Sequence, residues 1–167
     1  NLRVELDMAD VVERPAPRAA VEPEAPSVFD AMKATLKSGG VQIAVAHQLY
    51  PTPPEVAKRM VELADIEPGM CVLEPSAGTG NLIQAVRDAV DTEVLAYEIN
   101  NALCSKIRQR FQSFECVVNQ GDFLEVEQKF KYPRILMNPP FENGSDIKHI
   151  KRALEWLEEG GRLVGIC

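Results

Sequence analysis

The chain has 167 residues, of which 46% are hydrophobic, so it is long enough for one domain with a sizeable buried core but short for two. Its formal net charge of −7 argues against a protein whose whole surface binds nucleic-acid phosphates, because that binding rests largely on Lys and Arg. The 4 cysteines form no CxxC pair and there are only 2 histidines, so we expect neither a metal site nor a disulfide framework.

The amino-terminal segment, residues 1–44, carries little signal for a packed fold. Residues 1 to about 28 are rich in Pro, Ala and Glu, which predicts an extended arm or linker. They lack the basic and then apolar order of a signal peptide, and no apolar run reaches the roughly 18 to 20 residues that cross a bilayer. We therefore expect a cytoplasmic protein without a membrane contact. The arm is followed by a short predicted helix over 28–37, which ends at Gly39 and Gly40.

From about residue 45 the pattern becomes regular. Helical stretches start near Pro53, Asn81, Asn101 and Ser145, and they alternate with five short apolar runs: 70–75, 93–99, 115–120, 134–140 and 162–167. Strands that alternate with helices predict a parallel sheet covered on both faces, so residues 45–167 are expected to form one α/β domain. Because the chain stops at Cys167 within an apolar run, we expect this domain to be incomplete at its carboxyl end.

The first helical stretch follows the segment Tyr50-Pro-Thr-Pro. Thr52 occupies the place of an N-cap, Pro53 that of the first helical residue, and Glu55 completes a capping box. These features predict a helix start without any ligand. The expected buried face consists of Val56, Met60 and Leu63.

A turn of small residues, with Gly78 and Gly80, joins the first expected strand to the next helix. Glycines let a backbone approach a ligand closely, and the start of a helix offers free N–H groups. The dinucleotide fingerprint is incomplete, because Ile83 stands where its third glycine would be, and the lysine of a phosphate-binding P-loop is missing. The turn therefore predicts a nucleotide cofactor without a pyrophosphate.

Acidic residues end three successive expected strands. Glu74 would repel phosphate but can help hold the ammonium of an amino-acid moiety, as in S-adenosylmethionine. Glu98 is placed to accept both ribose hydroxyls and Asp122 to accept from the adenine amino group, with Ile99 against the ring and Phe123 beside it. Each acid alone is equally typical of an ordinary strand end. Because the carboxyl ends of parallel strands meet at one edge, the three together predict a cofactor site.

The fourth expected strand ends in Asn138-Pro-Pro-Phe141. The Asn138 amide oxygen and the Pro139 carbonyl can accept hydrogens from an exocyclic base amine, which favours a localised lone pair on its nitrogen. Pro139 and Pro140 would hold these acceptors in place before reaction, and Phe141 would offer a face for stacking the base. Asn-Pro is also typical of a plain turn. Because the tetrapeptide follows four segments that have features of a cofactor site, its position favours a role in methyl transfer.

The last helical stretch carries a row of basic residues, Lys148, His149, Lys151 and Arg152. An apolar stripe is formed by Ile147, Ile150, Leu154 and Leu157. We therefore expect the basic residues on the solvated side of an ordinary helix. Contact of the two lysines with DNA phosphates is the alternative.

Taken together, these segments resemble the S-adenosylmethionine-dependent DNA amino-methyltransferases, in particular the adenine-N6 enzymes of the gamma motif order. The resemblance covers about residues 45–167 and rests on Tyr50–Val56, Glu74–Gly80, the strand-end acids and the tetrapeptide Asn138–Phe141. It implies a Rossmann-like class I methyltransferase fold. Its doubly wound, mostly parallel sheet would have about five strands in the order 3-2-1-4-5, with further strands beyond the end of this chain.

The resemblance also implies roles for particular residues. The implied catalytic residues are Asn138, Pro139, Pro140 and Phe141. The implied cofactor-binding residues are Tyr50, Thr52, Glu74, Ser76, Ala77, Gly78, Gly80, Asn81, Glu98, Ile99, Asp122 and Phe123.

The function implied by the resemblance is methyl transfer from S-adenosylmethionine to the N6 amine of adenine in DNA. S-adenosylhomocysteine would be the product, no metal would be needed, and restriction-modification would be the setting. Two alternatives stay open. RNA or a protein glutamine can replace DNA, since related enzymes use the same tetrapeptide on other planar amines and amides. The other alternative is a non-catalytic module with a cofactor-binding or anti-restriction role. The Tyr50-Pro-Thr-Pro segment favours DNA.

Overall fold

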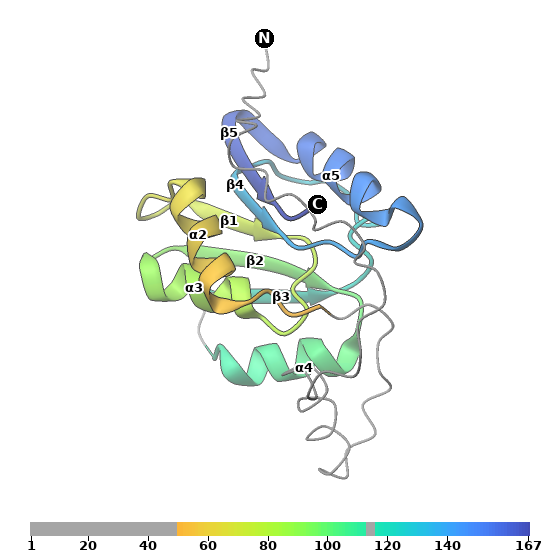
Figure 1. Ribbon diagram of the computed structural model, residues 1–167, viewed down its shortest axis with the longest axis horizontal. Helices are drawn as coiled ribbons and strands as arrows, with labels where there is room; N and C mark the ends of the chain where they lie inside the picture. The colour runs from red at the N-terminus through yellow and green to blue at the C-terminus, as the bar shows by residue number, and fades with distance from the viewer. Residues whose placement is uncertain (1–49, 113–115) are drawn as a thin grey trace, which may run out of the picture. The chain divides into compact units, whose positions relative to one another are not determined.

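Five parallel strands form one sheet with the order β3-β2-β1-β4-β5 in the computed structural model of the chain (Figure 1). The strands are β1 (Cys71–Glu74), β2 (Glu93–Glu98), β3 (Cys116–Gln120), β4 (Tyr132–Met137) and β5 (Leu157–Gly165). The predicted α/β class, parallel pairing and strand order are confirmed. The structure describes residues 50–112 and 116–167, so the expected arm and its short helix lie outside the described residues.

Helices cover both faces of this sheet (Figure 1). They are α2 (Pro54–Ala64), α3 (Asn81–Ala89), α4 (Asn101–Arg110) and α5 (Ser145–Glu155), with the short 3-10 helix η2 (Glu142–Gly144) before α5. The first three α-helices pack on one face and α5 packs on the other. The four predicted helix starts agree with these bounds to within one residue.

The strands are buried on both sides because successive side chains of a strand point to opposite faces. In β1, Val72 joins the apolar cluster under α2, α3 and α4, while Leu73 joins the cluster under α5. In β4, Leu136 faces the first cluster, whereas Ile135 and Met137 face the second. This two-sided burial explains why the strands read as continuous apolar runs.

The predicted capping box and buried face of α2 are wrong in detail. The N-cap is Pro53, with no side-chain cap, and Val56 is 39% exposed. The buried face consists of Ala57, Met60, Val61 and Ala64. The buried residues recur with the expected helical period, but the buried face is rotated relative to the prediction. The reason is that two alanines, which the prediction left out, contribute to this face.

The predicted apolar stripe of α5 is correct only in part, because Ile150 and Leu157 pack in the apolar cluster on this face of the sheet but the other two members do not. Ile147 is 55% exposed, Leu154 is exposed too, and the buried residues of the helix are His149 and Ala153. Leu157 does not belong to the helix, because β5 already begins there. The helical period therefore ends before the last residue that the prediction assigned to it.

Strand β5 starts earlier than the apolar run over 162–167 suggested. Tyr132 of β4 pairs with Leu157, but Arg134 pairs with Arg162, so the register shifts between these two pairs. Gly160 lies at this irregularity with a φ of 76°. A left-handed residue within a strand is typical of a bulge, which sequence periodicity does not reveal.

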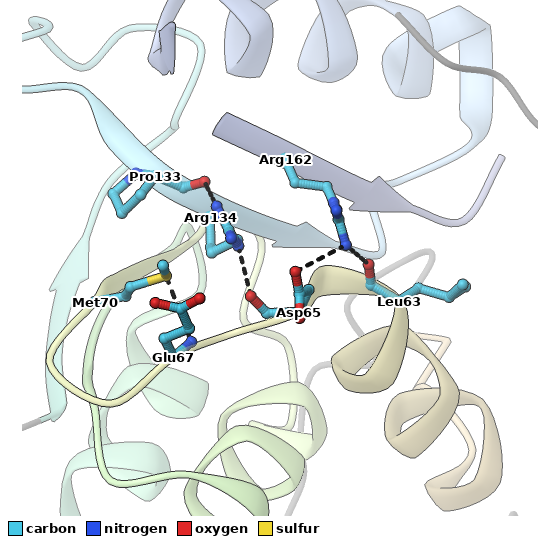
Figure 2. A network of polar contacts seen from close by, with 7 residues as sticks. All are labelled: Leu63, Asp65, Glu67, Met70, Pro133, Arg134 and Arg162. Carbon is cyan, nitrogen blue, oxygen red and sulfur yellow. Dashed lines mark hydrogen bonds and ion pairs between the residues drawn. The ribbon is translucent and has the colours of Figure 1, made fainter. Parts of the chain in front are cut away.

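Two arginines hold the carboxyl-terminal end of α2 (Figure 2). Arg134 of β4 donates from Nε to the Asp65 carbonyl at 3.0 Å and from Nη1 to the Pro133 carbonyl at 2.9 Å. Arg162 of β5 donates to the Leu63 carbonyl at 2.9 Å and lies 3.6 Å from the Asp65 carboxylate. The last carbonyls of a helix lack partners within it, so cationic donors are favourable there. These contacts tie α2 to the strand that leads into Asn138.

Within the two described ranges, no helix has the length and apolar character that crossing a membrane requires.

Candidate active site

A cavity of about 450 Å³ lies at the carboxyl-terminal edge of the sheet. Its walls come from the residues that follow β1, β2, β3 and β4, from the segment before α2 and from the first turns of α5. Small-molecule sites typically have roughly 300 to 1,000 Å³, so the volume suits a nucleotide-sized ligand. The predicted residues that line it are Tyr50, Thr52, Glu74, Ser76, Ala77, Gly78, Asn81, Glu98, Ile99, Asp122, Phe123, Asn138, Pro139 and Pro140.

Glu74 is an almost completely buried acid at the end of β1, only 2% exposed. Its carboxylate accepts a hydrogen bond from the backbone of Ile83, in the first turn of α3, while Oε2 has no partner among the described residues. Burial first, and the Glu98 carboxylate second, raise the pKa of Glu74 well above its usual value of 4.5. An acceptor left without a partner in such a place is costly, and a cationic ligand group would relieve that cost.

Glu98, at the end of β2, organises the glycine turn. Its Oε2 accepts from the backbone N–H of Gly78 at 2.7 Å, and its Oε1 accepts from the backbone N–H of Asn100 at 2.8 Å. The Glu98 carbonyl also accepts from Gly121 N–H at 3.0 Å. A carboxylate has about four acceptor positions, so two backbone bonds leave capacity for ligand hydroxyls. The buried side chain thus both shapes the turn and lines the cavity.

The third acid follows β3. Asp122 accepts from the Leu124 N–H at 2.9 Å and is half-buried in the cavity wall. Phe123 beside it is buried, whereas Ile99 after β2 is exposed and offers an apolar surface to the cavity. The three acids predicted to meet at one edge of the sheet do line one cavity.

Asn138 is held in a fixed orientation. Its Nδ2 donates to the Tyr50 carbonyl at 2.9 Å and to the Thr52 hydroxyl at 3.0 Å. Because a carbonyl only accepts hydrogen bonds, the amide nitrogen must face Tyr50, and Oδ1 remains the acceptor on the opposite side of the group. The Asn138 carbonyl accepts from the Ser76 hydroxyl at 3.2 Å, and Asn81 Nδ2 donates to the Thr52 carbonyl at 2.8 Å. Three motifs that are far apart in sequence therefore meet at this residue.

Two predicted residues do not line the cavity. Gly80 precedes α3 with a φ of 77°, and a Cβ at this position would lie 3.0 Å from Cε2 of Phe111. The absence of a side chain at this position thus allows the positive φ of the turn and the close packing against Phe111 at the end of α4. Phe141 lies outside the wall as well, with its ring centroid 6.5 Å from that of Tyr50 at an interplanar angle of 58°.

Sequence reasoning missed some lining residues, above all His149 and Ser145 of α5. His149 was expected on the solvated side of the helix, but it is 7% exposed. Its Nδ1 lies 2.8 Å from the Ser145 carbonyl, and its ring stacks on Phe123 with centroids 6.3 Å apart. The signal that could have found it is its place one helical turn after Ser145, at the start of the helix that follows Asn138–Phe141.

No group of three or more His, Cys, Asp or Glu side chains among the described residues could hold a metal ion. The thiols of Cys71, Cys104, Cys116 and Cys167 are free. Burial raises the pKa of Cys71, Cys104 and Cys116, so thiolate formation is disfavoured at these sites.

Residues 57–167 match the methyltransferase small domain family. The chain belongs to this family. An rRNA methyltransferase of Streptomyces thermotolerans is 33% identical over 110 residues, which are 65% of this chain and 34% of that protein. Ribosomal RNA small subunit methyltransferase A of Thermotoga neapolitana is 27% identical over 110 residues, 65% of this chain and 41% of that protein. The chain therefore spans less than half the length of these relatives.

Among solved structures, an RNA methyltransferase from Salinibacter ruber in complex with S-adenosylhomocysteine matches with a TM-score of 0.60. It is 22% identical, and the match covers 70% of this chain and 76% of that one. The predicted Rossmann-like class I methyltransferase fold and its methyl donor, S-adenosylmethionine, are thus confirmed at the level of the family. The names of these two relatives refer to ribosomal RNA and not to DNA or to restriction-modification.

Proposed function

We propose that this chain is the cofactor-binding and catalytic part of an N-methyltransferase that acts on the exocyclic amine of a nucleobase in RNA. The choice of RNA is supported by the names of the relatives. The choice of an amine as the acceptor is supported by the fixed amide of Asn138, which is the observation that carries the proposal.

The chemical argument begins with the weak nucleophilicity of a base amine, whose lone pair is delocalised into the ring. Two acceptors that bind its hydrogens favour a pyramidal nitrogen with a localised lone pair. Asn138 Oδ1 and the Pro139 carbonyl are the proposed acceptors. Since Tyr50 and Thr52 already fix the amide, little reorganisation is required when the amine arrives.

When bound, S-adenosylmethionine would supply an electrophilic sulfonium methyl group for the amine nitrogen. S-adenosylhomocysteine would be the leaving group, and the proton lost by the nitrogen would pass to solvent. The residues proposed to hold the cofactor are the three acids. The unpaired Glu74 oxygen suits the ammonium end, whether directly or through water, Glu98 suits the ribose hydroxyls, and Asp122 suits the adenine amine. Ile99 offers its exposed apolar side chain to the ring.

The first testable prediction concerns Asn138→Ala. It should reduce methyl transfer by on the order of a hundredfold or more, because a preorganised polar group at the reacting atom is lost. Affinity for S-adenosylhomocysteine should stay within about twofold, since the amide is not among the proposed cofactor contacts. The assay measures tritium transferred from the labelled cofactor to ribosomal RNA by the natural full-length polypeptide, and calorimetry measures the affinity.

The matched control is Asn101→Ala, which removes an exposed asparagine of α4 that does not line the cavity. This variant should keep full activity. An active Asn138→Ala enzyme would refute the role assigned to the amide. Cofactor binding without transfer to any polymer would instead favour a non-catalytic module.

DNA remains the second candidate substrate, and one specific observation favours it. The Tyr50-Pro-Thr-Pro segment, which resembles that of the DNA enzymes, contacts the Asn138 amide directly. The same assay therefore includes duplex DNA, single-stranded DNA and a protein with exposed glutamines. Label that enters DNA but never RNA would replace the proposed substrate, and label that enters only protein would replace both.

A further inference from the structure

His149 is a buried polar residue in the wall of the cavity that the proposed reaction does not use. It belongs to α5, far in sequence from the three acids, and its ring lies beside that of Phe123, with centroids 6.3 Å apart and an interplanar angle of 27°. Phe123 is the residue next to Asp122. The stacking therefore brings the imidazole to the part of the cavity where the loop after β3 passes.

The hydrogen bonds of His149 define its tautomer. Nδ1 lies 2.8 Å from the carbonyl oxygen of Ser145 and 3.3 Å from the hydroxyl of the same residue. A carbonyl oxygen cannot donate, so Nδ1 carries the proton, and in the neutral ring Nε2 is then an acceptor.

Nε2 itself has no hydrogen-bond partner within residues 50–112 and 116–167. The side chain is 7% exposed and lines the cavity, so Nε2 is available to a partner that enters the cavity. Among the fully buried polar atoms without a partner in the described residues, Glu74 Oε2 also lines the cavity, whereas Trp156 Nε1 and Thr92 Oγ1 belong to residues that do not. An acceptor on a largely buried side chain in the wall of a cavity is available to a donor on a bound ligand.

We propose that His149 Nε2 and the Asp122 carboxylate together recognise the amino group of the cofactor's adenine. An amino group carries two hydrogens, and the two acceptors approach from different elements, the loop after β3 and helix α5. This pairing makes His149 a residue that determines cofactor specificity. The inference rests on the proposed function, because it assumes that the adenine lies beside Asp122.

The test compares two ligands that differ at the exocyclic group of the base and in the proton that hypoxanthine carries on N1. The N1 difference is the same for every protein variant, so a change in the affinity ratio between variants reports on the substituted residue. S-adenosylhomocysteine carries the amino group, whereas its hypoxanthine analogue, S-inosylhomocysteine, carries a carbonyl oxygen that cannot donate. Calorimetry on the 167-residue chain gives the ratio of the two affinities. His149→Phe keeps an aromatic ring on Phe123 but removes the acceptor, so the ratio in favour of the amino ligand should fall by about five- to tenfold.

Two further variants support the comparison. His149→Gln offers a carbonyl oxygen as acceptor and should keep part of the discrimination, and it remains informative if the Phe variant does not fold. Ile147→Ala changes an exposed residue of the same helix outside the cavity, and it should leave the ratio unchanged. Circular dichroism confirms that each variant is folded.

The outcomes separate the inference from the function on which it rests. An unchanged affinity ratio in folded His149→Phe, or in folded His149→Leu should the Phe variant not fold, with normal binding of S-adenosylhomocysteine, overturns the role of His149 alone. Absence of S-adenosylhomocysteine binding by the unsubstituted chain overturns the proposed function and this inference with it. A reduced ratio in the Phe variant, partly restored by Gln and unaffected in the Ile147 control, supports the recognition of the amino group.

Discussion

At the scale of single residues, Glu74 shows how an unsatisfied hydrogen-bond acceptor on a buried side chain indicates a ligand. One of its oxygens serves the first turn of α3 and the other has no partner among the described residues. The raised pKa of Glu74 means that the carboxyl keeps its proton to a higher pH than an exposed glutamate does. A cation placed beside it reverses that preference, because it stabilises the charged form.

Binding of the cofactor should therefore release a proton from Glu74. An ammonium near the carboxyl lowers its pKa, so at a pH between the values of the bound and free protein the group changes from protonated to charged. Calorimetric titration with S-adenosylhomocysteine in buffers of different ionisation enthalpy measures the number of protons released. Glu74→Gln should abolish this release, because an amide does not titrate.

The control for this prediction is Glu55→Gln, an exposed acid of α2 that does not line the cavity. Its proton release should match that of the unsubstituted chain. If Glu74→Gln released the same number of protons, the proton would come from another group and the assignment of Glu74 would be wrong.

Residue types were easier to predict than their hydrogen bonds. The three strand-end acids follow from sequence position, because the ends of parallel strands share an edge. Thr52 does not follow in the same way. Its local sequence predicts an N-cap, yet its hydroxyl accepts from Asn138, which lies 86 positions further along the chain. Local patterns carry no information on such a partner, so the tertiary contact prevails over the capping signal.

At the scale of elements, the anchoring of α2 determines the position of the segment that fixes Asn138. Arg134 is buried and its guanidinium satisfies two backbone carbonyls, those of Asp65 and Pro133 (Figure 2). Arg134→Met should lower the free energy of unfolding by about 1 to 3 kcal/mol, because it removes a buried side chain whose donors serve two partly buried carbonyls. Urea denaturation followed by circular dichroism measures this change.

Lys58→Ala is the matched control for that variant, since it removes a cation from an exposed position of α2 itself. Its effect should stay within about 0.5 kcal/mol. Equal losses in both variants would show that charge alone, rather than the satisfied carbonyls, accounts for the stability.

Helix α5 shows what sequence periodicity does and does not predict about an element. Its existence and its start at Ser145 follow from the pattern, but the face that it buries does not. Counting large aliphatic residues selected Ile150, which packs on the sheet, but also Ile147 and Leu154, which are exposed. It missed Ala153 and, just after the helix, Trp156, which cover the sheet, and His149, which lines the cavity. Aromatic and histidine side chains are apolar over much of their surface, and the stripe that packs is set by the partner surface.

At the scale of the whole molecule, the alternation of strands and helices was sufficient to predict the parallel sheet, and the resemblance supplied its order. The cavity could be predicted as a place but not as a shape. Its walls come from the ends of four strands, the segment before α2 and the start of α5, so its form depends on how all these elements pack. Two apolar clusters, one on each face of the sheet, join these elements.

Because the cavity draws on so many elements, a ligand that fills it should stabilise the folded chain as a unit. A ligand that binds only the folded state adds about 2.7 kcal/mol at a concentration of 100 times its dissociation constant. For a domain of this size that corresponds to a rise in melting temperature on the order of 5 to 15 °C. Thermal unfolding with and without S-adenosylhomocysteine measures the shift, with free methionine as the ligand control.

Glu98→Gln should sharply reduce this ligand-induced shift in melting temperature. The amide nitrogen would face the N–H of either Gly78 or Asn100 and open the glycine turn. A full shift in that variant would contradict the role of the Glu98 carboxylate in shaping the cavity.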